Sequence, residues 1–326
     1  MRHDLTLVAT SILCALLGGV VNGKDGNLPG IASGSVDQSI RFWDSDGKES
    51  ANFMAHDGAV NCLIYLSDGR VISGGDDNCV KVWSIDGLLD STFQSPPEKT
   101  AHSKPVLCLA LSPNGKVLAS GGADRLVRFW NPATGKLLQS IPAHNGSVKS
   151  LAWSPDGQTL ASGGADRLVQ LWRANGSRGG TIIGHDEAVT ALAWTQDNRA
   201  LITGSADGNI CAWNIPDYTS IARTHGHSKS VTAIALSPDG RTLATAGSDQ
   251  KLRIWSFSGK AFTETASLTY DKPINCLAWG PRGQILIAGS SDKTLRYYGG
   301  TGYATLKTVK AHDGPITTLA VAPIKN

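Results

Sequence analysis

One arithmetic pattern recurs along this chain. A histidine is followed 22 residues later by an aspartate, and a tryptophan comes six residues after the aspartate. Four units with this spacing lie about 42 residues apart: His102, Asp124, Trp130; His144, Asp166, Trp172; His185, Asp207, Trp213; and His227, Asp249, Trp255. A fifth unit, His56, Asp77 and Trp83, is one residue shorter. Self-similarity at a fixed period of this length predicts a repeat architecture.

Two further units are incomplete, and each has what the other lacks. Near the start, Ser33, Asp37 and Trp43 stand at the usual spacing without a preceding histidine. Near the end, His312 is followed by one strand-like run over 315–321. We therefore expect a closed ring whose last unit is built from both termini, because closure hides the edge strands that an open array would expose.

Each unit reads as four short strands. In one of them they cover roughly 148–154, 159–163, 169–172 and 181–183, and Ser-Pro-Asp-Gly at 154–157 is a strong hairpin signal. The strands are dense in Val, Ile, Leu, Ala and Trp with weak alternation, which is typical of a sheet covered on both faces. After residue 30 no stretch has a sustained helical period, so the predicted class is all-β.

These motifs resemble those of the WD40-repeat β-propellers. The resemblance rests on Gly184-His185, Gly226-His227, the Ser/Thr-Gly-x-x-Asp turns, the terminal tryptophans and one literal Trp43-Asp44 pair, and it covers about residues 28 to 322. It implies a single propeller over 24–326 with seven four-stranded antiparallel blades, the last one closed by strands from both termini. It also implies a docking platform without catalysis or cofactor.

A serine or threonine stands four residues before each aspartate of the full units and of the first partial one: Ser33, Ser73, Ser120, Ser162, Thr203 and Thr245. Ser, His and Asp together suggest a hydrolase triad, but a catalytic triad occurs once, in an accessible pocket. Six copies that each end in a tryptophan are better explained as structure. In the family the histidine bridges the aspartate and the hydroxyl, and the hydroxyl reaches the indole N–H.

One unit departs from the pattern. Tyr270 stands at the histidine position, Ala288 at the hydroxyl position and Tyr298 at the tryptophan position, so that only Asp292 is left. We expect Asp292→Ala to cost less stability than Asp166→Ala, because the usual partners of Asp292 are already absent. Two interpretations stay open: drift in a blade that packing alone holds, or a weaker blade that opens or binds a partner.

Composition excludes several classes of function. Charged residues make up 17% of the chain and the net charge is +3, which is too mild a balance for a nucleic-acid-binding protein. The spacing of the six cysteines predicts neither a zinc site nor a disulfide framework. His225-Gly226-His227 resembles a ligand pair, but His227 is already used in its blade. We therefore expect no metal and no cofactor.

The N-terminal segment leaves the localisation open. Residues 5–21 form an apolar run behind Met1-Arg2-His3-Asp4. Residues 1–23 read as a signal peptide, a retained membrane anchor, or a degenerate strand at a misassigned start. A signal sequence or anchor would make the protein exported or membrane-anchored, and otherwise we expect it in the cytoplasm. Membrane contact is expected only through this segment.

The resemblance implies where a protein or peptide partner would dock. The face that carries the loops before each first strand and the turns between second and third strands is the family's usual docking surface. By position, the candidate partner-binding residues are Asp76, Lys104, Arg125, Lys149, Arg167, Thr190, Thr232, Asn275 and Thr317. Residues 118–127 and 160–169 are identical, which places Arg125 and Arg167 on adjacent blades. They read as solvated residues of a recent duplication or as a patch for a carboxylate-bearing peptide.

The predicted function is a non-catalytic scaffold that binds a protein or peptide on this face. The alternative is an exported propeller enzyme or small-ligand-binding protein. An unpaired cluster of His, Asp or Glu at the channel mouth would favour the alternative, and the sequence predicts none. One loop, around Ser95 to Thr100, is longer than its counterparts and contains Pro96-Pro97, so it is a second candidate contact.

Overall fold

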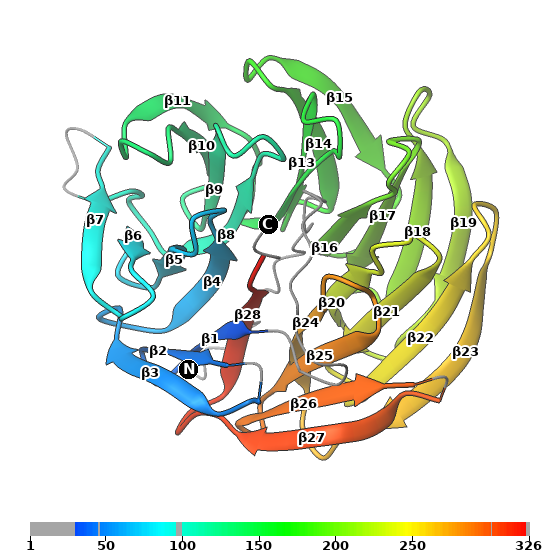
Figure 1. The fold of residues 1–326 in the computed structure, drawn as a ribbon. Coiled ribbons are helices and arrows are strands. Elements are labelled where there is room, and N and C mark those ends of the chain that lie inside the picture. The colour runs from blue at the N-terminus through cyan, green and yellow to red at the C-terminus, as the bar shows by residue number, and fades with distance from the viewer. Residues whose placement is uncertain (1–29, 45, 96–99, 301, 324–326) are drawn as a thin grey trace, which may run out of the picture.

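The computed structural model describes residues 30–44, 46–95, 100–300 and 302–323. These residues form seven sheets of four strands arranged in a ring (Figure 1). The proposed leader or anchor at 1–23 lies outside the described residues, as do residues 96–99 of the long loop. Within the described part, no helix is long and apolar enough to cross a membrane.

Six of the seven blades run outward from the ring centre through four strands in chain order. Blade 1 contains β4 (Val60–Tyr65), β5 (Val71–Gly75), β6 (Val80–Trp83) and β7 (Leu89–Phe93). Blade 2 contains β8 (Val106–Leu111), β9 (Leu118–Gly122), β10 (Leu126–Trp130) and β11 (Leu137–Pro142). Blade 3 contains β12 (Val148–Trp153), β13 (Thr159–Gly164), β14 (Leu168–Arg173) and β15 (Arg178–Ile183).

The second half of the ring repeats this order. Blade 4 contains β16 (Val189–Trp194), β17 (Ala200–Ser205), β18 (Asn209–Asn214) and β19 (Ser220–His225). Blade 5 contains β20 (Val231–Leu236), β21 (Thr242–Gly247), β22 (Lys251–Phe257) and β23 (Phe262–Thr269). Blade 6 contains β24 (Ile274–Trp279), β25 (Ile285–Ser290), β26 (Thr294–Gly299) and β27 (Ala304–Lys310).

The seventh, shared blade closes the ring as the sequence predicts. Its order is β28 (Ile316–Val321), β1 (Ile31–Ser35), β2 (Ser39–Trp43) and β3 (Glu49–Met54). β1 pairs antiparallel with β28, so that Ile31 stands opposite Val321. The innermost strand therefore comes from the C-terminal end and the other three from the N-terminal end. The all-β, seven-bladed prediction is confirmed.

The core lies between neighbouring blades. The inner strands are almost wholly buried, and the outermost strand of each blade consists mainly of exposed and half-buried residues, which alternate along part of its length, as in β27. This burial explains the apolar runs in the inner strands, because both of their faces are covered by adjacent blades. Only the outermost strands face solvent, so only they show the period of two.

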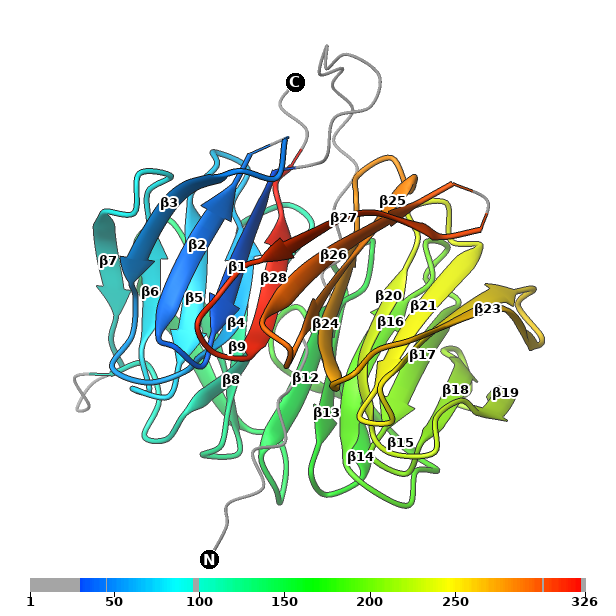
Figure 2. The ribbon, with the colours of Figure 1, turned by 90° about the horizontal axis from the view of Figure 1, so that it is seen from below.

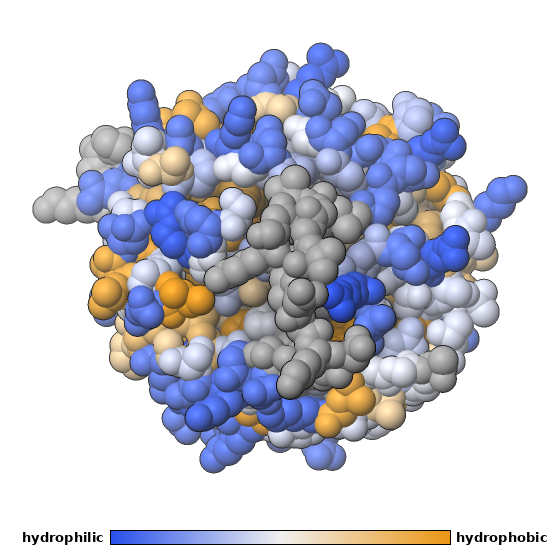
Figure 3. Space-filling view, viewed as in Figure 1, coloured by the Kyte–Doolittle hydropathy of each residue, from blue (hydrophilic) through white to orange (hydrophobic). Residues whose placement is uncertain are grey.

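The ring has two faces, seen edge-on in Figure 2. We call one the His/Asp face: it carries the loops between blades, with their histidines, and the turns between second and third strands, with their aspartates. We call the other the hairpin face: it carries the turns between first and second and between third and fourth strands. The hairpin face points toward the viewer in Figures 1 and 3.

Candidate functional site

A chain of hydrogen bonds links three elements of each regular blade. In blade 3, His144 Nδ1 lies 2.9 Å from Asp166 Oδ1 and His144 Nε2 lies 2.8 Å from Ser162 Oγ. The indole N–H of Trp172 donates to the same hydroxyl oxygen over 2.9 Å. An ionised carboxylate only accepts, so the Nδ1–H donates to Asp166 and the hydroxyl donates to Nε2. The loop, the turn and the third strand are thereby joined.

Blades 1, 2, 4 and 5 have the same contacts. The imidazole-to-hydroxyl distance is 2.7 Å in blades 1, 2 and 4 and 2.8 Å in blade 5. All six hydroxyl-bearing residues at this position, the one in the shared blade included, have no exposed surface: Ser33, Ser73, Ser120, Ser162, Thr203 and Thr245. A hydroxyl that is enclosed and hydrogen-bonded on both sides has no access to a substrate. The Ser/Thr-His-Asp networks therefore have a structural role within each blade.

Burial and hydrogen bonding fix the ionisation of these groups. Burial lowers the pKa of His102, His144 and His185 below the ordinary value, and the neighbouring aspartates only partly offset this. Burial alone would raise the pKa of Asp124, but hydrogen bonds from His102 and Arg128 hold that pKa well below its usual range. The networks of blades 2 and 4 therefore pair a neutral imidazole with an ionised carboxylate.

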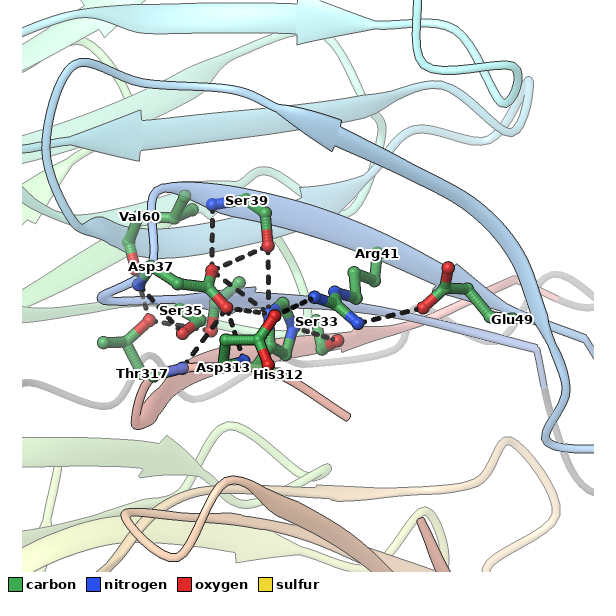
Figure 4. A network of polar contacts seen from close by, with 12 residues as sticks. Ser33, Ser35, Asp37, Ser39, Arg41, Glu49, Val60, His312, Asp313 and Thr317 are labelled. Atoms are coloured by element: carbon green, nitrogen blue, oxygen red, sulfur yellow. Dashed lines mark hydrogen bonds and ion pairs between the residues drawn. The ribbon is translucent and has the colours of Figure 1, made fainter. Parts of the chain in front are cut away.

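The shared blade completes its network across the two ends of the chain (Figure 4). Ser33 Oγ lies 2.8 Å from His312 Nε2 and accepts from the Trp43 indole at the same distance. Asp37 Oδ2 lies 3.1 Å from His312 Nδ1. On the outside, Arg41 forms ion pairs with two acidic residues, one from each end of the chain. The half-units recognised in the sequence thus form one site.

Blade 6 replaces the network rather than losing it. The hydroxyls of Tyr270 and Tyr298 are hydrogen-bonded, and the Arg296 guanidinium lies 4.0 Å from the centre of the Tyr270 ring. Arg296 also donates to Asp292 over 2.7 Å, and Thr294 donates to the same carboxylate from both its backbone N–H and its hydroxyl. The usual partners of Asp292 are absent, as expected, but the Arg296 cation and two donors of Thr294 take the place of the imidazole.

The sequence did contain a signal for this cation. A Lys or Arg stands four residues after several of the network aspartates, and Lys81, Arg128 and Arg296 each form an ion pair with the aspartate of their own blade. The spacing crosses a tight turn, which brings the two side chains to the same side of the third strand. The count of histidines and tryptophans alone does not reveal these pairs.

Four of the predicted partner-binding residues have a different role. Thr190, Thr232, Asn275 and Thr317 are 1–4% exposed. Each donates to a backbone carbonyl in the first strand of the next blade, as Thr190 Oγ1 does to Val231 over 2.6 Å. Asn61 makes the equivalent bond to Val106. The prediction that these four residues point out toward a partner is wrong, because their side chains join neighbouring blades.

A bulge in each first strand produces this orientation. In blade 4, Val189 pairs with Ser205 and Ala191 with Gly204, so Thr190 is left without a partner in the ladder. The same shift in register leaves Lys149 in blade 3 and Leu107 in blade 2 without a partner in the ladder. Neither of these two residues donates to the next blade. Burial lowers the pKa of Lys149, which is half-buried, so this cation is only partly available on the His/Asp face.

The remaining candidates are exposed. Lys104, Arg125 and Arg167 lie on the loops and turns of blades 2 and 3, and none forms an ion pair with a described residue. Arg125 and Arg167 both have a φ of 72°, in the left-handed region. Asp76, on blade 1, is exposed and accepts a hydrogen bond from Asn61 over 2.8 Å. Two adjacent blades therefore present cations without internal partners.

The cysteines and the remaining histidine of the described residues form no site of their own. Cys62, Cys79, Cys108, Cys211 and Cys276 are free thiols, and burial raises the pKa of each. Among the residues the structure describes, no group of three or more His, Cys, Asp or Glu is placed to hold a metal ion. His225 lies 3.4 Å from Asn209, apart from the network that uses His227.

The sequence of this chain is similar to β-propeller family models and to several repeat-containing proteins. The family model described as "IFT122 first beta-propeller" matches residues 90–326, and "WD domain, G-beta repeat" matches 17–44 and 47–84. A p21-activated protein kinase-interacting protein 1-like from Danio rerio is 33% identical over 32% of this chain and 28% of its own length. Ribosome biogenesis protein YTM1 from Debaryomyces hansenii is 29% identical over 32% and 24%.

A CCR4-associated factor 4 homolog from Candida glabrata is 29% identical over 37% of this chain and 21% of its own length. The matched segments thus span about a quarter of these relatives. The first family model, in contrast, covers well over half of the present chain. Together with the seven four-stranded blades, this match shows that the chain belongs to the WD40-repeat β-propeller family.

Proposed function

We propose that the chain is a non-catalytic scaffold that binds an acidic segment of a protein partner on the His/Asp face, at blades 2 and 3. One observation carries the proposal. Arg125 and Arg167 occupy matched, exposed turns of adjacent blades, and their guanidinium groups form no ion pair or hydrogen bond with a described residue. Guanidinium groups without internal partners bind carboxylates in bidentate geometry.

The backbone does not require arginine at these turns. The same left-handed position is held by Gln38, Asn78, Gln250 or Lys293 in other blades, and by Gly208 in blade 4. A left-handed residue other than glycine costs roughly 1–2 kcal/mol. Two arginines at a position where glycine and asparagine fit best support a role for the side chains. Lys104 adds a third exposed cation on blade 2.

The neighbouring blades limit the length of the partner segment. Exposed Asp57 and Asp76 lie on blade 1, and exposed Asp186 and Glu187 lie on blade 4. An acidic segment that extended onto either blade would meet like charge, which disfavours binding. We therefore expect a short acidic stretch with neutral or basic flanks. Relatives named as a kinase-interacting protein and a CCR4-associated factor support protein binding in general.

The test is a charge reversal of the three exposed cations, Lys104→Glu, Arg125→Glu and Arg167→Glu. The probe is a fluorescein-labelled hexaglutamate peptide, measured by anisotropy, alongside capture of partners from native extract. We expect binding to weaken about tenfold or more, because like charges then face each other. Lys149 is left unchanged, since burial makes a carboxylate there a risk to the fold.

The matched control reverses three exposed cations of the hairpin face, Lys116, Arg199 and Lys260. The control should bind like the wild type, and both triple variants should unfold within about 0.5 kcal/mol per site of the wild type. If the two triple variants bind alike, the arginines are only solvated. The docking site would then have to be sought at the loop between Ser95 and Thr100.

A further inference from the structure

The turn between β6 and β7 ends in an apolar tip formed by Ile85, Leu88 and Leu89. These side chains are 55%, 69% and 53% exposed. A backbone bond of 2.9 Å from Ser84 N to Leu88 O closes the turn. The residues that close the equivalent turns of blades 7, 2, 3 and 4 are all polar: Lys48, Lys136, Ser177 and Thr219. The turn therefore does not require a leucine, and exposed apolar side chains gathered at one point indicate a contact surface.

The apolar tip is held in place by the shared blade. The Gly87 position packs against the ring of Phe53, and that ring lies 4.9 Å from the ring of Trp83. Figure 3 shows hydrophobic surface over this part of the hairpin face, on the left of the view. Because the turn is fixed against a neighbouring ring, its three apolar side chains remain at the surface.

Most acidic residues near the apolar tip already have a cation nearby in the same chain. These are Asp90 with Arg70, Glu49 with Arg41, and Asp44 with Lys48 and Lys307. The carboxylates of Asp46 and Asp86, in contrast, are exposed and form no ion pair or hydrogen bond with a described residue. Asp86 stands within the tip itself, between Ile85 and Leu88. A surface that complements the tip is therefore apolar and carries a positive charge.

A groove of about 560 Å³ runs beside β7, between blades 1 and 2. It is lined by Ser91, Thr92 and Gln94 of blade 1 and by residues 134–137 of blade 2. Leu89 of the apolar tip is the first residue of β7 and Ser91 is the third, so the tip and the groove adjoin along one strand. Half-buried Leu137 and the aliphatic stem of Lys136 give the groove an apolar wall.

Lys136 gives this groove the positive charge that complements the apolar tip. Its side chain is exposed and forms no ion pair or hydrogen bond with a described residue, Asp86 included. One rim thus carries an apolar tip with a free carboxylate and, next to it, a groove with a free ammonium group. In a contact with twofold symmetry, residue i meets residue j while residue j meets residue i. Two copies of this chain can therefore each place the tip in the other's groove.

We propose that the apolar tip and the adjoining groove bind a second copy of this chain in a dimer with twofold symmetry. Ile85 and Leu88 of each copy enter the groove of the other, and Asp86 pairs with the other copy's Lys136. A contact made by one turn and one groove is small, so the dimer is weak and reversible. The His/Asp faces stay free, and the dimer presents two of them. The pairing does not depend on the proposed function.

Charge exchange tests the pairing in the full chain, by sedimentation equilibrium from low micromolar to near-millimolar concentration. Asp86→Lys and Lys136→Asp should each weaken dimer formation about tenfold or more, because like charges then meet in both contacts. In an equimolar mixture of the two variants, both contacts again join a lysine to an aspartate, so a mixed dimer should form. Lys260→Asp, at an exposed lysine in the equivalent turn of blade 5, is the matched control and should dimerise like the wild type.

The apolar part of the contact is tested by Ile85→Ser with Leu88→Ser. This double change should weaken the dimer several-fold and keep the fold, since equivalent turns carry polar residues. Ile183→Ser with Leu306→Ser, at side chains that are 77% and 55% exposed on other blades, is the control and should have no effect. A wild type that stays monomeric over the whole concentration range would sink the proposal. So would association that survives either charge reversal, or two variants that form no mixed dimer, because the tip then has a different occupant.

Discussion

At the residue scale, the same polar atoms serve two different purposes in this ring. Serine and threonine hydroxyls at the network position are used twice within one blade, as Ser162 shows. Hydroxyls at the bulged position of the first strand instead bond to the next blade, as Thr190 shows. Both kinds are buried, so both contribute mainly by leaving no donor or acceptor without a partner.

The bonds between blades predict a measurable effect. Thr190→Val keeps the branched shape but removes the donor to the Val231 carbonyl, so we expect the free energy of unfolding to fall by about 1 kcal/mol. Thr263→Val, at an exposed strand residue, is the control and should change stability by much less. Urea denaturation of both variants decides this. Equal losses would show that the bond contributes nothing specific to stability.

The buried histidines predict a loss of stability in mild acid. The folded-state pKa of His102, His144 and His185 is lowered, so the unfolded chain takes up protons first as the pH falls. The stabilisation they give is complete above the unfolded pKa, about 6.5, and is lost as the pH falls below it. A second loss follows below about pH 4, where aspartates such as Asp124 become protonated in the unfolded chain.

Chemical denaturation across the pH range tests this. His102→Gln should reduce the decline between pH 7.5 and 5.5, because one of the groups responsible is gone. His225→Gln, at an exposed histidine, should leave the decline as it is in the wild type. A wild-type stability that is flat across this range would contradict the assignment of neutral, buried imidazoles.

At the scale of the blade, two different polar arrangements hold equivalent elements together. In blade 3 the carboxylate of Asp166 accepts from His144 and from the backbone N–H of Asn145. In blade 6 the carboxylate of Asp292 accepts from Arg296, which in turn covers the Tyr270 ring. The difference lies in exposure: the His144 side chain is 0% exposed and the Arg296 side chain is 21% exposed.

This difference predicts unequal losses on mutation. Asp166→Ala leaves a buried imidazole donor without a partner, so we expect a cost of about 2–3 kcal/mol. Asp292→Ala should cost less, because the released Arg296 can turn toward water and keep part of its hydration. Guanidinium denaturation of both variants gives the comparison. Equal costs would mean that blade 6 relies on its carboxylate as much as a regular blade does.

At the scale of the whole molecule, the ring depends on a pairing between the two ends of the chain. β28 joins β1 on one side and packs against the first strands of the adjacent blades. His312 completes a network whose serine lies 279 residues away in the sequence, and the tryptophan lies ten residues from that serine. Closure leaves each sheet edge either covered by neighbours or at the outer rim, which limits edge-to-edge association.

Deletion of residues 311–326 tests closure directly. It removes β28 and His312, exposes the inner edge of β1 and leaves the Ser33 hydroxyl without its imidazole acceptor. We expect the product to aggregate or to lose its cooperative unfolding transition, as size-exclusion chromatography and calorimetry would show. Deletion of residues 324–326, which lie beyond β28, is the control. A soluble monomer that unfolds cooperatively after the larger deletion would contradict the closed ring.

The sequence by itself determined the architecture, because the repeat records local pairing. The hairpin turns, the strand lengths and the network positions all recur at a fixed period, and the two half-units imply closure. The left-handed turns at Arg125 and Arg167 and the network of His312 follow from that period. Each of these features depends on residues close in sequence or on the equivalence of the repeats, and both can be read from spacing.

Only the tertiary structure decided where the remaining side chains point. A bulge turns Thr190 toward a carbonyl of another blade, and no spacing within its own unit encodes that acceptor. Arg296 reaches Tyr270 and Asp292 together because a turn and a loop meet there. These relations join distant segments, so packing in three dimensions fixes them.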